Sequence, residues 1–270
     1  MQTLTRPWTP AYAPRSAWRT LLHWQTGLSR RFDRFLPAEF RIDGNRDFID
    51  HLVPEYLRPG MLIYDVGGGK NPILSAERKS ELNLRIIGLD MDAEELAAAP
   101  KSRYDDTICA DISGYRGTGE ADLVICQALL EHVPDTNRAL AAIASILKPG
   151  GRALIFVPSR NAVYARLNLI LPQGLKRRTL YGIFPEMARD HGFPAYYNGC
   201  TPARLERMAQ AHGLVRERRR LYFHSTYFSF CFPLHTLWRL WLLFFRFLAG
   251  AEAAETFSVV FRKPVSARFL

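Results

Sequence analysis

The chain has 270 residues, 48% of them hydrophobic, which is enough for one large core or for one core with an appendage. Its four cysteines show no C-x-x-C spacing, which argues against a zinc site or a disulfide framework and favours a reducing compartment. The net charge of +10 is uneven, because residues 61–159 hold 10 basic and 14 acidic residues and residues 160–220 hold 12 and 4. The basic excess points to an acidic partner at the periphery: substrate phosphates, anionic lipid or nucleic acid.

The first 60 residues predict a helical extension. Residues 1–14 are rich in proline, and the N-terminus lacks the apolar segment of a signal peptide. Over residues 16–36, apolar residues recur at roughly helical spacing among arginines, which predicts a basic amphipathic helix with a break near Gly27. We expect this helix to pack on the core with its basic face in solvent; contact with a surface or with the substrate is the alternative. A second short helix is predicted at about residues 46–57.

An apolar run at residues 61–66 predicts a buried strand. It is followed by Gly67, Gly68 and Gly69. Residues without side chains allow a tight turn in which a ligand approaches the main chain closely. Pro72 stands where we expect the first turn of a helix over residues 73–82. The segment therefore predicts a strand, a glycine turn and a helix in succession.

Four further strands are predicted at about residues 85–90, 106–110, 121–126 and 152–158, with helical segments between them. This alternation indicates a parallel, doubly wound sheet. Asp90 ends the second strand about 20 residues after the glycines, where nucleotide-binding folds hold a ribose diol. Asp111 and Gln127 end the next two strands. Because parallel strands bind ligands at their carboxyl edge, we expect these side chains and the glycine turn to meet there.

Five motifs together resemble class I S-adenosylmethionine-dependent methyltransferases, in the broad group that includes the ubiquinone and menaquinone methyltransferases. They are Asp65-Val-Gly-Gly-Gly69, Gly88-Leu-Asp-Met-Asp92, Ala110-Asp-Ile112, Leu130-Glu-His-Val-Pro-Asp135 and Leu147-Lys-Pro-Gly-Gly151. The resemblance implies an α/β fold: a Rossmann-like, doubly wound, seven-stranded sheet of six parallel strands and an antiparallel last strand, with N-terminal helices and cap insertions. It divides the chain into an N-terminal helical extension, 1–60, and a methyltransferase domain, 61–270.

The resemblance also implies how S-adenosyl-L-methionine would be held. Asp65 and the three glycines would face its methionine part, and Asp90 would bind its ribose hydroxyls. One departure is visible, because Lys70-Asn71-Pro72 replaces the third glycine of the usual loop. We therefore expect Lys70 or Asn71 near the carboxylate of the cofactor.

Four further residues would meet the cofactor, three of them at its adenine end. Met91 would pack on the adenine, and Asp111 and Ile112 would address its amino group and ring edge. Gln127 would line the pocket beside the sulfonium. A nicotinamide-dependent oxidoreductase is the competing Rossmann-type interpretation, but it would need Gly-x-Gly-x-x-Gly, and position 72 is proline.

Methyl transfer from a sulfonium mainly requires approach geometry and exclusion of water, with a general base where the acceptor is an alcohol. The catalytic candidates are His132 and His191, and the candidate substrate contacts are Tyr181, Tyr196 and Tyr197. A structural role is the alternative for each histidine: orientation of the loop for His132, and a solvated loop position for His191. No cluster of Asp, Asn and His suggests a metal, so we expect none.

Two segments are expected to determine which acceptor is used. Residues 159–200 mix basic and aromatic residues and predict a cap over the acceptor, with a basic surface excursion as the alternative. Residues 229–252 predict an apolar helical insertion that is too short and too rich in arginine to cross a membrane. At about 100° per residue, His235, Arg239 and Arg246 fall within about 40° of one another. Such a basic stripe could reach lipid phosphates, or it could be buried against the N-terminal helices or in a dimer.

The remaining elements predicted are a helix from Thr201 to before Gly213 and strands at about 218–228 and 256–262. Because the sixth strand of the class I topology ends on the ligand edge, both acceptor segments should lie beside the site.

These features predict an S-adenosyl-L-methionine-dependent O-methyltransferase for an amphiphilic acceptor, such as a lipid-linked or polyprenyl-phosphate-linked saccharide. We expect it to be cytoplasmic and peripheral at the inner face of the membrane, with residues 233–249 at the membrane surface. The alternatives are a methyltransferase of a soluble small molecule or quinone-like ring, and a non-catalytic cofactor-fold binding or assembly module. Nucleic acid is not expected as a substrate, because Cys126-Gln-Ala-Leu129 stands where an Asn/Asp-Pro-Pro-Tyr motif would follow strand four.

Overall fold

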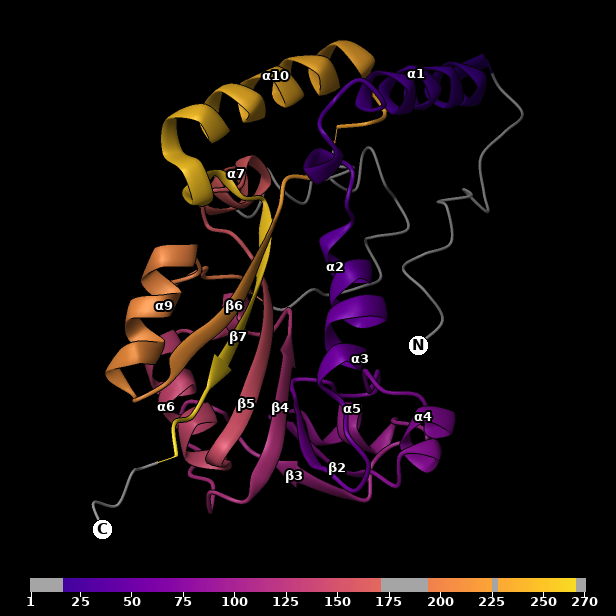
Figure 1. The fold of residues 1–270 in the computed structure, drawn as a ribbon. Coiled ribbons are helices and arrows are strands. Elements are labelled where there is room, and N and C mark those ends of the chain that lie inside the picture. Colours follow the sequence, from indigo (N-terminus) through magenta and orange to yellow (C-terminus); the bar gives the residue numbers. More distant parts are fainter. Residues whose placement is uncertain (1–16, 171–193, 225–227, 266–270) are drawn as a thin grey trace.

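A computed structural model describes residues 17–170, 194–224 and 228–265. A seven-stranded sheet runs through the middle of the molecule, in the order β3-β2-β1-β4-β5-β7-β6 (Figure 1). The strands are β1 (Leu62–Val66), β2 (Arg85–Asp90), β3 (Asp106–Cys109), β4 (Ala121–Gln127), β5 (Leu147–Pro158), β6 (Val215–Tyr222) and β7 (Thr256–Arg262).

The direction of the strands confirms the predicted fold. β1 to β5 pair in parallel, and β7 is antiparallel to both β5 and β6, so β6 runs with the other five. In this register Thr256, at the start of β7, lies between Pro158 and Tyr222, at the ends of β5 and β6. The segment that joins β6 to β7 therefore leaves and re-enters the sheet at the carboxyl edge of the parallel strands.

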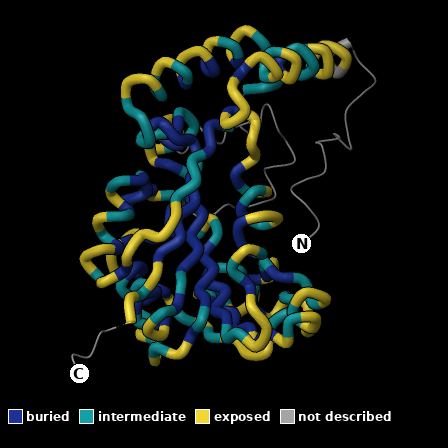
Figure 2. Tube along the Cα trace, viewed as in Figure 1, coloured by how far each residue is buried: buried dark blue, intermediate teal, exposed yellow. Residues whose placement is uncertain are grey.

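Helices cover both faces of the sheet, because alternate side chains of each strand point to opposite faces. Tyr64 and Val66 of β1 join the core cluster that includes α6 (Thr136–Ile146) and α9 (Pro202–Ala211). Ile63 joins the opposite cluster. Its helical members include residues of η2 (Phe48–Leu52) and α3 (Val53–Tyr56), which follow α2 (Gly44–Asp47) in the chain. Figure 2 shows the buried strands between these layers. The short elements α4 (Ala76–Glu81), α5 (Ala93–Ala97) and η3 (Leu130–His132) follow β1, β2 and β4.

A third group of helices lies beyond the sheet, across the top of Figure 1. It consists of α1 (Ala17–Asp33), η1 (Ala38–Phe40), α7 (Val163–Ile170), α10 (Phe232–Ala249) and η5 (Gly250–Ala253). Its own apolar cluster joins the first and last parts of the chain, since Leu36 and Phe40 pack with Phe223, Trp238 and Leu242. The two aromatic rings Phe40 and Phe223 stack with their centroids 5.0 Å apart.

The basic stripe of α10 faces this cluster and not the solvent. His235 and Arg239 are 1% and 0% exposed, and both contact Asp33 of α1, with Nε2 and Nε each 3.0 Å from its Oδ1. Arg246 is paired with Glu39 at 3.7 Å. The prediction that this stripe reaches lipid phosphates is therefore wrong, and its alternative, burial against the N-terminal helices, is found.

Several predicted bounds were also wrong. α4 begins at Ala76 and not near Pro72, because the Ser75 side chain caps it by accepting from the Arg78 N–H at 3.2 Å. α1 runs unbroken through Gly27. β6 begins and ends earlier than predicted, because its arginine-rich run is held by acidic partners: Arg220 Nη1, for example, is 2.8 Å from Asp47 Oδ2.

Two glycine substitutions should change stability in opposite directions. A Cβ at Gly88, within β2, would lie 2.7–2.9 Å from atoms of the Tyr104 ring, so Gly88→Ala should destabilise the fold by about 1–3 kcal/mol. A Cβ at Gly27 would meet nothing within 4 Å, so Gly27→Ala should stabilise α1 by about 0.5–1 kcal/mol. Gly114→Ala is the matched control, since the nearest atom to its Cβ would be the Asp111 carbonyl oxygen at 3.8 Å, an ordinary contact. Equal melting temperatures for the three variants would contradict the packing described.

Candidate functional site

The glycine turn after β1 needs its glycines for two reasons. Gly67 and Gly69 have φ of +79° and +46°, in the left-handed region that favours glycine. A Cβ at Gly68 would lie 2.5 Å from the Tyr104 hydroxyl and 2.7 Å from Asp65 Oδ2. The turn therefore combines a left-handed backbone, which only glycine adopts readily, with the close approach of two polar side chains.

Asp65 is the buried anchor of this turn. Its Oδ2 accepts a hydrogen bond from the Ile73 N–H at 3.0 Å and lies 3.3 Å from the Tyr104 hydroxyl, which is also 3.3 Å from the Gly69 carbonyl oxygen. Burial raises the pKa of Asp65 to about 6, although these two hydrogen bonds oppose the shift. Through these hydrogen bonds, Asp65 holds the conformation of the loop. We did not predict Tyr104; the signal for it was Gly88, a glycine inside a buried strand, which marks a close approach.

Asp90 lies next to the glycine turn, as predicted. A Cβ at Gly69 would be 3.3 Å from Asp90 Oδ2, and Asp90 Oδ1 accepts from the Asp92 N–H at 3.0 Å. Asp92, two residues further on, caps α5, because its carboxylate accepts from the Glu94 and Glu95 N–H groups at 2.9 and 3.1 Å. The two aspartates therefore have different roles.

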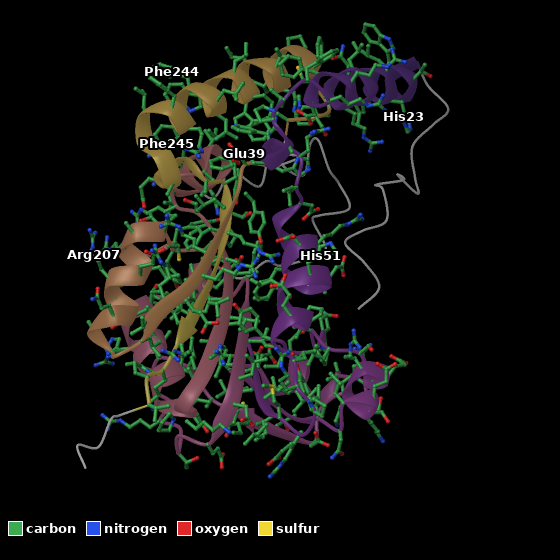
Figure 3. All side chains as sticks on the ribbon, viewed as in Figure 1. His23, Glu39, His51, Arg207, Phe244 and Phe245 are labelled. Carbon is green, nitrogen blue, oxygen red and sulfur yellow. The ribbon has the colours of Figure 1, made fainter. Side chains whose placement is uncertain are left out.

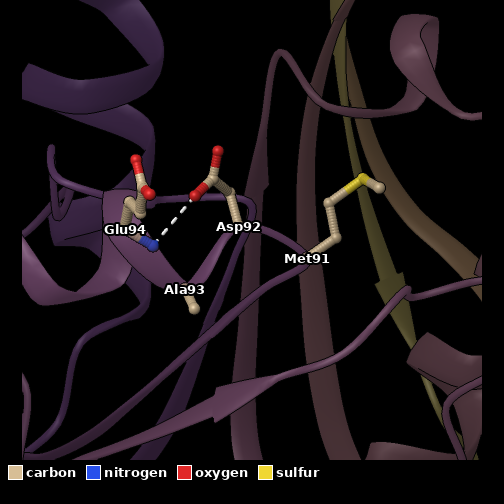
Figure 4. A pocket seen from close by; sticks show the side chains of 4 residues that line it. All are labelled: Met91, Asp92, Ala93 and Glu94. Carbon is tan, nitrogen blue, oxygen red and sulfur yellow. Dashed lines mark hydrogen bonds between the residues drawn. The ribbon is translucent and has the colours of Figure 1, made fainter.

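A hollow of about 360 Å³ opens directly after Asp90. It is lined by Met91, Asp92, Ala93 and Glu94 (Figure 4). The Met91 side chain is 67% exposed, so its thioether is available to a planar ligand group at this place.

Negative charge gathers around the turn. Burial and the nearby carboxylates Asp92 and Glu95 raise the pKa of Asp90, although the Asp92 N–H opposes the shift. Lys70 is ion-paired with Glu95 at 2.8 Å, where we had expected it near a ligand carboxylate. Carboxylates that repel one another favour a cationic ligand, which relieves the repulsion.

The other candidate cofactor-binding residues lie at or just after the ends of β3 and β4. Asp111 is exposed, and Ile112 is 4% exposed and belongs to the core. The Gln127 side-chain amide donates to Asn45 Oδ1 of α2, a contact between residues 82 positions apart that no sequence pattern indicated. Ala128 follows with φ of +49°, a strained backbone of the kind found at functional sites.

His132 and Glu131 form a pair on η3. His132 Nδ1 lies 3.0 Å from the Pro194 carbonyl oxygen, which can only accept, so Nδ1 carries the proton and the lone pair is on Nε2. Nε2 is 3.8 Å from Glu131 Oε1. Burial raises the pKa of the Glu131 carboxyl to about 8, and its Oε2 has no hydrogen-bond partner among the described residues. Glu131 was not predicted.

The segment that follows residue 193 is tied to η3 by its backbone. Tyr196 and Tyr197 donate their N–H groups to the Glu131 carbonyl at 2.7 and 3.0 Å. Tyr197 is 6% exposed and packs in the core, and Tyr196 is 39% exposed. The other two candidates from the cap, Tyr181 and His191, lie outside the described residues.

Within the described part of the chain, no group of three or more His, Cys, Asp or Glu residues could hold a metal ion. The site is therefore built from the glycine turn, Asp65, Asp90, the hollow at Met91 and the η3 pair.

Comparison with known proteins gives one family and consistent relatives. The family model described as "Methyltransferase domain" matches residues 37–218. The chain is similar to the ubiquinone biosynthesis O-methyltransferase of Aeromonas salmonicida, with 31% identity over 163 residues, 58% of this chain and 63% of that protein. The same enzyme of Colwellia psychrerythraea is 32% identical over 161 residues, 57% and 61% of the two chains. The matched region thus spans less than two thirds of these relatives.

Solved structures agree on the fold. An S-adenosylmethionine-dependent methyltransferase from Mesorhizobium loti has a TM-score of 0.51 at 16% identity and covers 79% of this chain and 95% of its own. A [4+2]-cyclase, SpnF, has a TM-score of 0.50 at 18% identity and covers 80% of both chains. Because proteins with different chemistry share this fold, the fold alone does not specify the reaction.

Proposed function

The chain belongs to the methyltransferase domain family and has the fold of class I S-adenosylmethionine-dependent methyltransferases, and we propose that it methylates an oxygen of an amphiphilic acceptor. The acceptor class we favour is a lipid-linked saccharide, met at the inner face of the membrane. The observation that carries the proposal is that the glycine turn and Asp90 adjoin at the sheet edge to which the apolar insertion is also attached.

The residues present fit S-adenosyl-L-methionine. The glycine turn, whose main chain is not covered by side chains of its own, lies next to Asp90. The surrounding carboxylates suit a ligand that carries a sulfonium and an ammonium group. Asp90 would hold the ribose hydroxyls, Asp65 and the turn would face the methionine part, and Met91 would pack on the adenine. When bound, the cofactor supplies a methyl group already activated by positive sulfur. The protein supplies position and excludes water.

An alcohol acceptor must also lose a proton, and His132 would take it. Its Nδ1–H is held by the Pro194 carbonyl, which leaves Nε2 as the basic nitrogen. Glu131 Oε1 lies 3.8 Å from Nε2, and this carboxyl, which burial keeps largely protonated at neutral pH, would help to orient the imidazole ring. Tyr196, the more exposed of the two tyrosines that follow the cap, would line the acceptor site.

The acceptor class is proposed from the helices that follow the strands at the carboxyl edge of the sheet. α7 and α10 leave the sheet from the ends of β5 and β6, and both expose apolar side chains. An acceptor with an apolar part and a sugar hydroxyl would fit such a place. A quinone-like ring is the second candidate, favoured by the similarity to two ubiquinone biosynthesis O-methyltransferases at 31% and 32% identity.

Mass spectrometry of cell extracts tests the proposal. Cells that lack the protein, or that carry only Asp90→Ala, should contain a lipid or lipid-linked glycan lighter by one methylene group than in wild-type cells. A change confined to water-soluble metabolites, or to a quinone precursor, would reject the lipid-linked saccharide as the acceptor.

Cofactor affinity should depend on pH near 6. The folded-state pKa of Asp65 lies above its ordinary value of 3.8, so its contribution to stability is present at low pH and is lost as the pH rises through about 6. A cationic cofactor prefers the ionised carboxylate, so calorimetry should show affinity rising from about pH 5 to 7. Asp65→Asn, which keeps an acceptor for the Ile73 N–H, should flatten this dependence. A wild-type affinity that does not change with pH would contradict a role for Asp65 in binding.

A further inference from the structure

The outer side of α10 is apolar along its length. Its six most exposed large apolar side chains are Leu237, Leu240, Trp241, Phe244, Phe247 and Leu248, each between 47% and 85% exposed. At about 100° per residue they share an arc of about 120°, and no charged residue of α10 falls on that arc. Figure 3 shows Phe244 on this outer side, whereas Phe245 packs toward α7, where Arg166 lies 5.8 Å from its ring centre. We call this arc the outer apolar face.

The buried polar contacts hold the helix in this orientation. Arg239 donates to Asp33 on α1 and, at 2.6 Å, to the Phe223 carbonyl oxygen. Its guanidinium lies 5.2 Å from the Trp238 ring centre. Rotation of α10 to hide its apolar residues would expose this buried network, so the outer apolar face is fixed toward the surroundings. A single soluble domain rarely exposes an apolar surface of this extent.

Charge around this face favours an anionic lipid surface. Helical spacing places Leu21, Trp24 and Arg31 of α1 within an arc of about 80°, and all three are exposed. Arg30 of α1 and Arg34, which follows the helix, are also exposed. The one acidic residue in the sequences of α1 and α10 is Asp33, which faces inward to Arg239. Arginines beside an apolar, aromatic face are typical of helices that lie in the membrane interface.

A second copy of the chain would fit this surface less well, because α1 of each copy would bring its arginines toward the same interface. Among the described residues, no helix is long and apolar enough to cross a membrane. The contact would therefore lie in the plane of the interface.

We propose that the protein docks on an anionic lipid bilayer through the outer apolar face of α10, with the exposed arginines of α1 at the lipid phosphates. This inference deepens the proposed function, since docking would bring the active site to a lipid-linked acceptor. It does not require catalysis, so the two can fail separately.

Flotation of the full-length protein with vesicles tests the inference without cofactor or acceptor. The protein should float with vesicles of phosphatidylcholine and phosphatidylglycerol, and less with phosphatidylcholine alone. Phe244→Glu with Phe247→Glu should abolish flotation, and Arg31→Gln should weaken binding to the mixed vesicles about fivefold. The controls Val215→Glu, on exposed β6, and Arg207→Gln, on exposed α9, should float as the wild type does (Figure 3 labels Arg207).

Three outcomes would overturn the inference. The first is that the wild type does not float with either vesicle. The second is equal loss of flotation in the control variants. The third is a dimer, seen by light scattering without vesicle binding, that becomes monomeric in the Phe244→Glu, Phe247→Glu variant, since a second copy would then cover the face. Unchanged melting temperatures show that these exposed substitutions leave the fold intact.

Discussion

Replacing Asp90 by alanine should weaken the binding of S-adenosyl-L-methionine by about 10- to 100-fold, the effect of losing hydrogen bonds to a charged group. Asp90 stands at the end of β2 beside the glycine turn, where a ribose would lie. Because burial and neighbouring carboxylates raise the pKa of Asp90, its removal should not lower the melting temperature of the cofactor-free protein. Isothermal calorimetry and thermal unfolding measure the two effects separately.

Asp106→Ala is the matched control for this experiment. Asp106 begins β3, pairs in register with Ile87 and is exposed at the other end of the strands. Its loss should leave affinity unchanged. Asp92 is unsuitable as a control, because it caps α5. Equal affinity of Asp90→Ala and the wild type would contradict the placement of the nucleoside.

Replacing Arg239 by alanine should lower the free energy of unfolding by about 3–5 kcal/mol, the effect of breaking a buried ion pair. The side chain is 0% exposed, and its guanidinium joins Asp33, the Phe223 carbonyl and the aromatic ring of Trp238. The variant leaves Asp33 without this partner and leaves a cavity beneath α10. Denaturant unfolding, followed by circular dichroism, measures the loss.

Arg246→Ala is the matched control, since Arg246 is on the same helix but its side chain is 39% exposed and its ion pair with Glu39 spans 3.7 Å. We expect a change of less than about 1 kcal/mol for such an exposed pair. The double variant Asp33→Leu, Arg239→Met should recover part of the stability, because neither charge of the Asp33–Arg239 pair is then left without the other. Equal effects of Arg239→Ala and Arg246→Ala would contradict the buried network.

The contact between Asp33, His235 and Arg239 should make stability depend on pH in the acid range. Burial opposes ionisation of Asp33, but its hydrogen bond with His235 and the charge of Arg239 together hold its pKa below the ordinary value of 3.8. A depressed folded-state pKa contributes stability above the unfolded value, and this stability is lost as the pH falls through the folded value. The contact between α1 and α10 should therefore weaken below about pH 4.

The strands themselves, and the approach of Asp90 to the glycine turn, could be predicted because both depend on patterns within short stretches of sequence. Apolar runs predicted the strands, and the glycines and Asp90 follow two of them at a characteristic distance. Tyr104 could be inferred only indirectly, because its side chain lies where a Cβ at Gly68 or Gly88 would be. The contact of Gln127 with Asn45 had no local signal, since it joins residues 82 positions apart.

The basic stripe of α10 shows the limit of periodicity. Helical spacing correctly placed His235, Arg239 and Arg246 on one side of a helix, but it could not show which side faces inward. That depends on Asp33, 206 positions before Arg239 in the sequence, and on the carbonyl of Phe223. Because those partners neutralise the stripe, the apolar side became the exposed one.

The central claim is methyl transfer to an amphiphilic acceptor, and incubation of the purified protein with methyl-labelled S-adenosyl-L-methionine and a membrane extract tests it most directly. We predict label in the organic-solvent phase, on a glycan-bearing lipid, in an ether linkage that mild alkali does not release. Asp90→Ala should give none. Label confined to the aqueous phase, or equal label with Asp90→Ala, would contradict the proposed function.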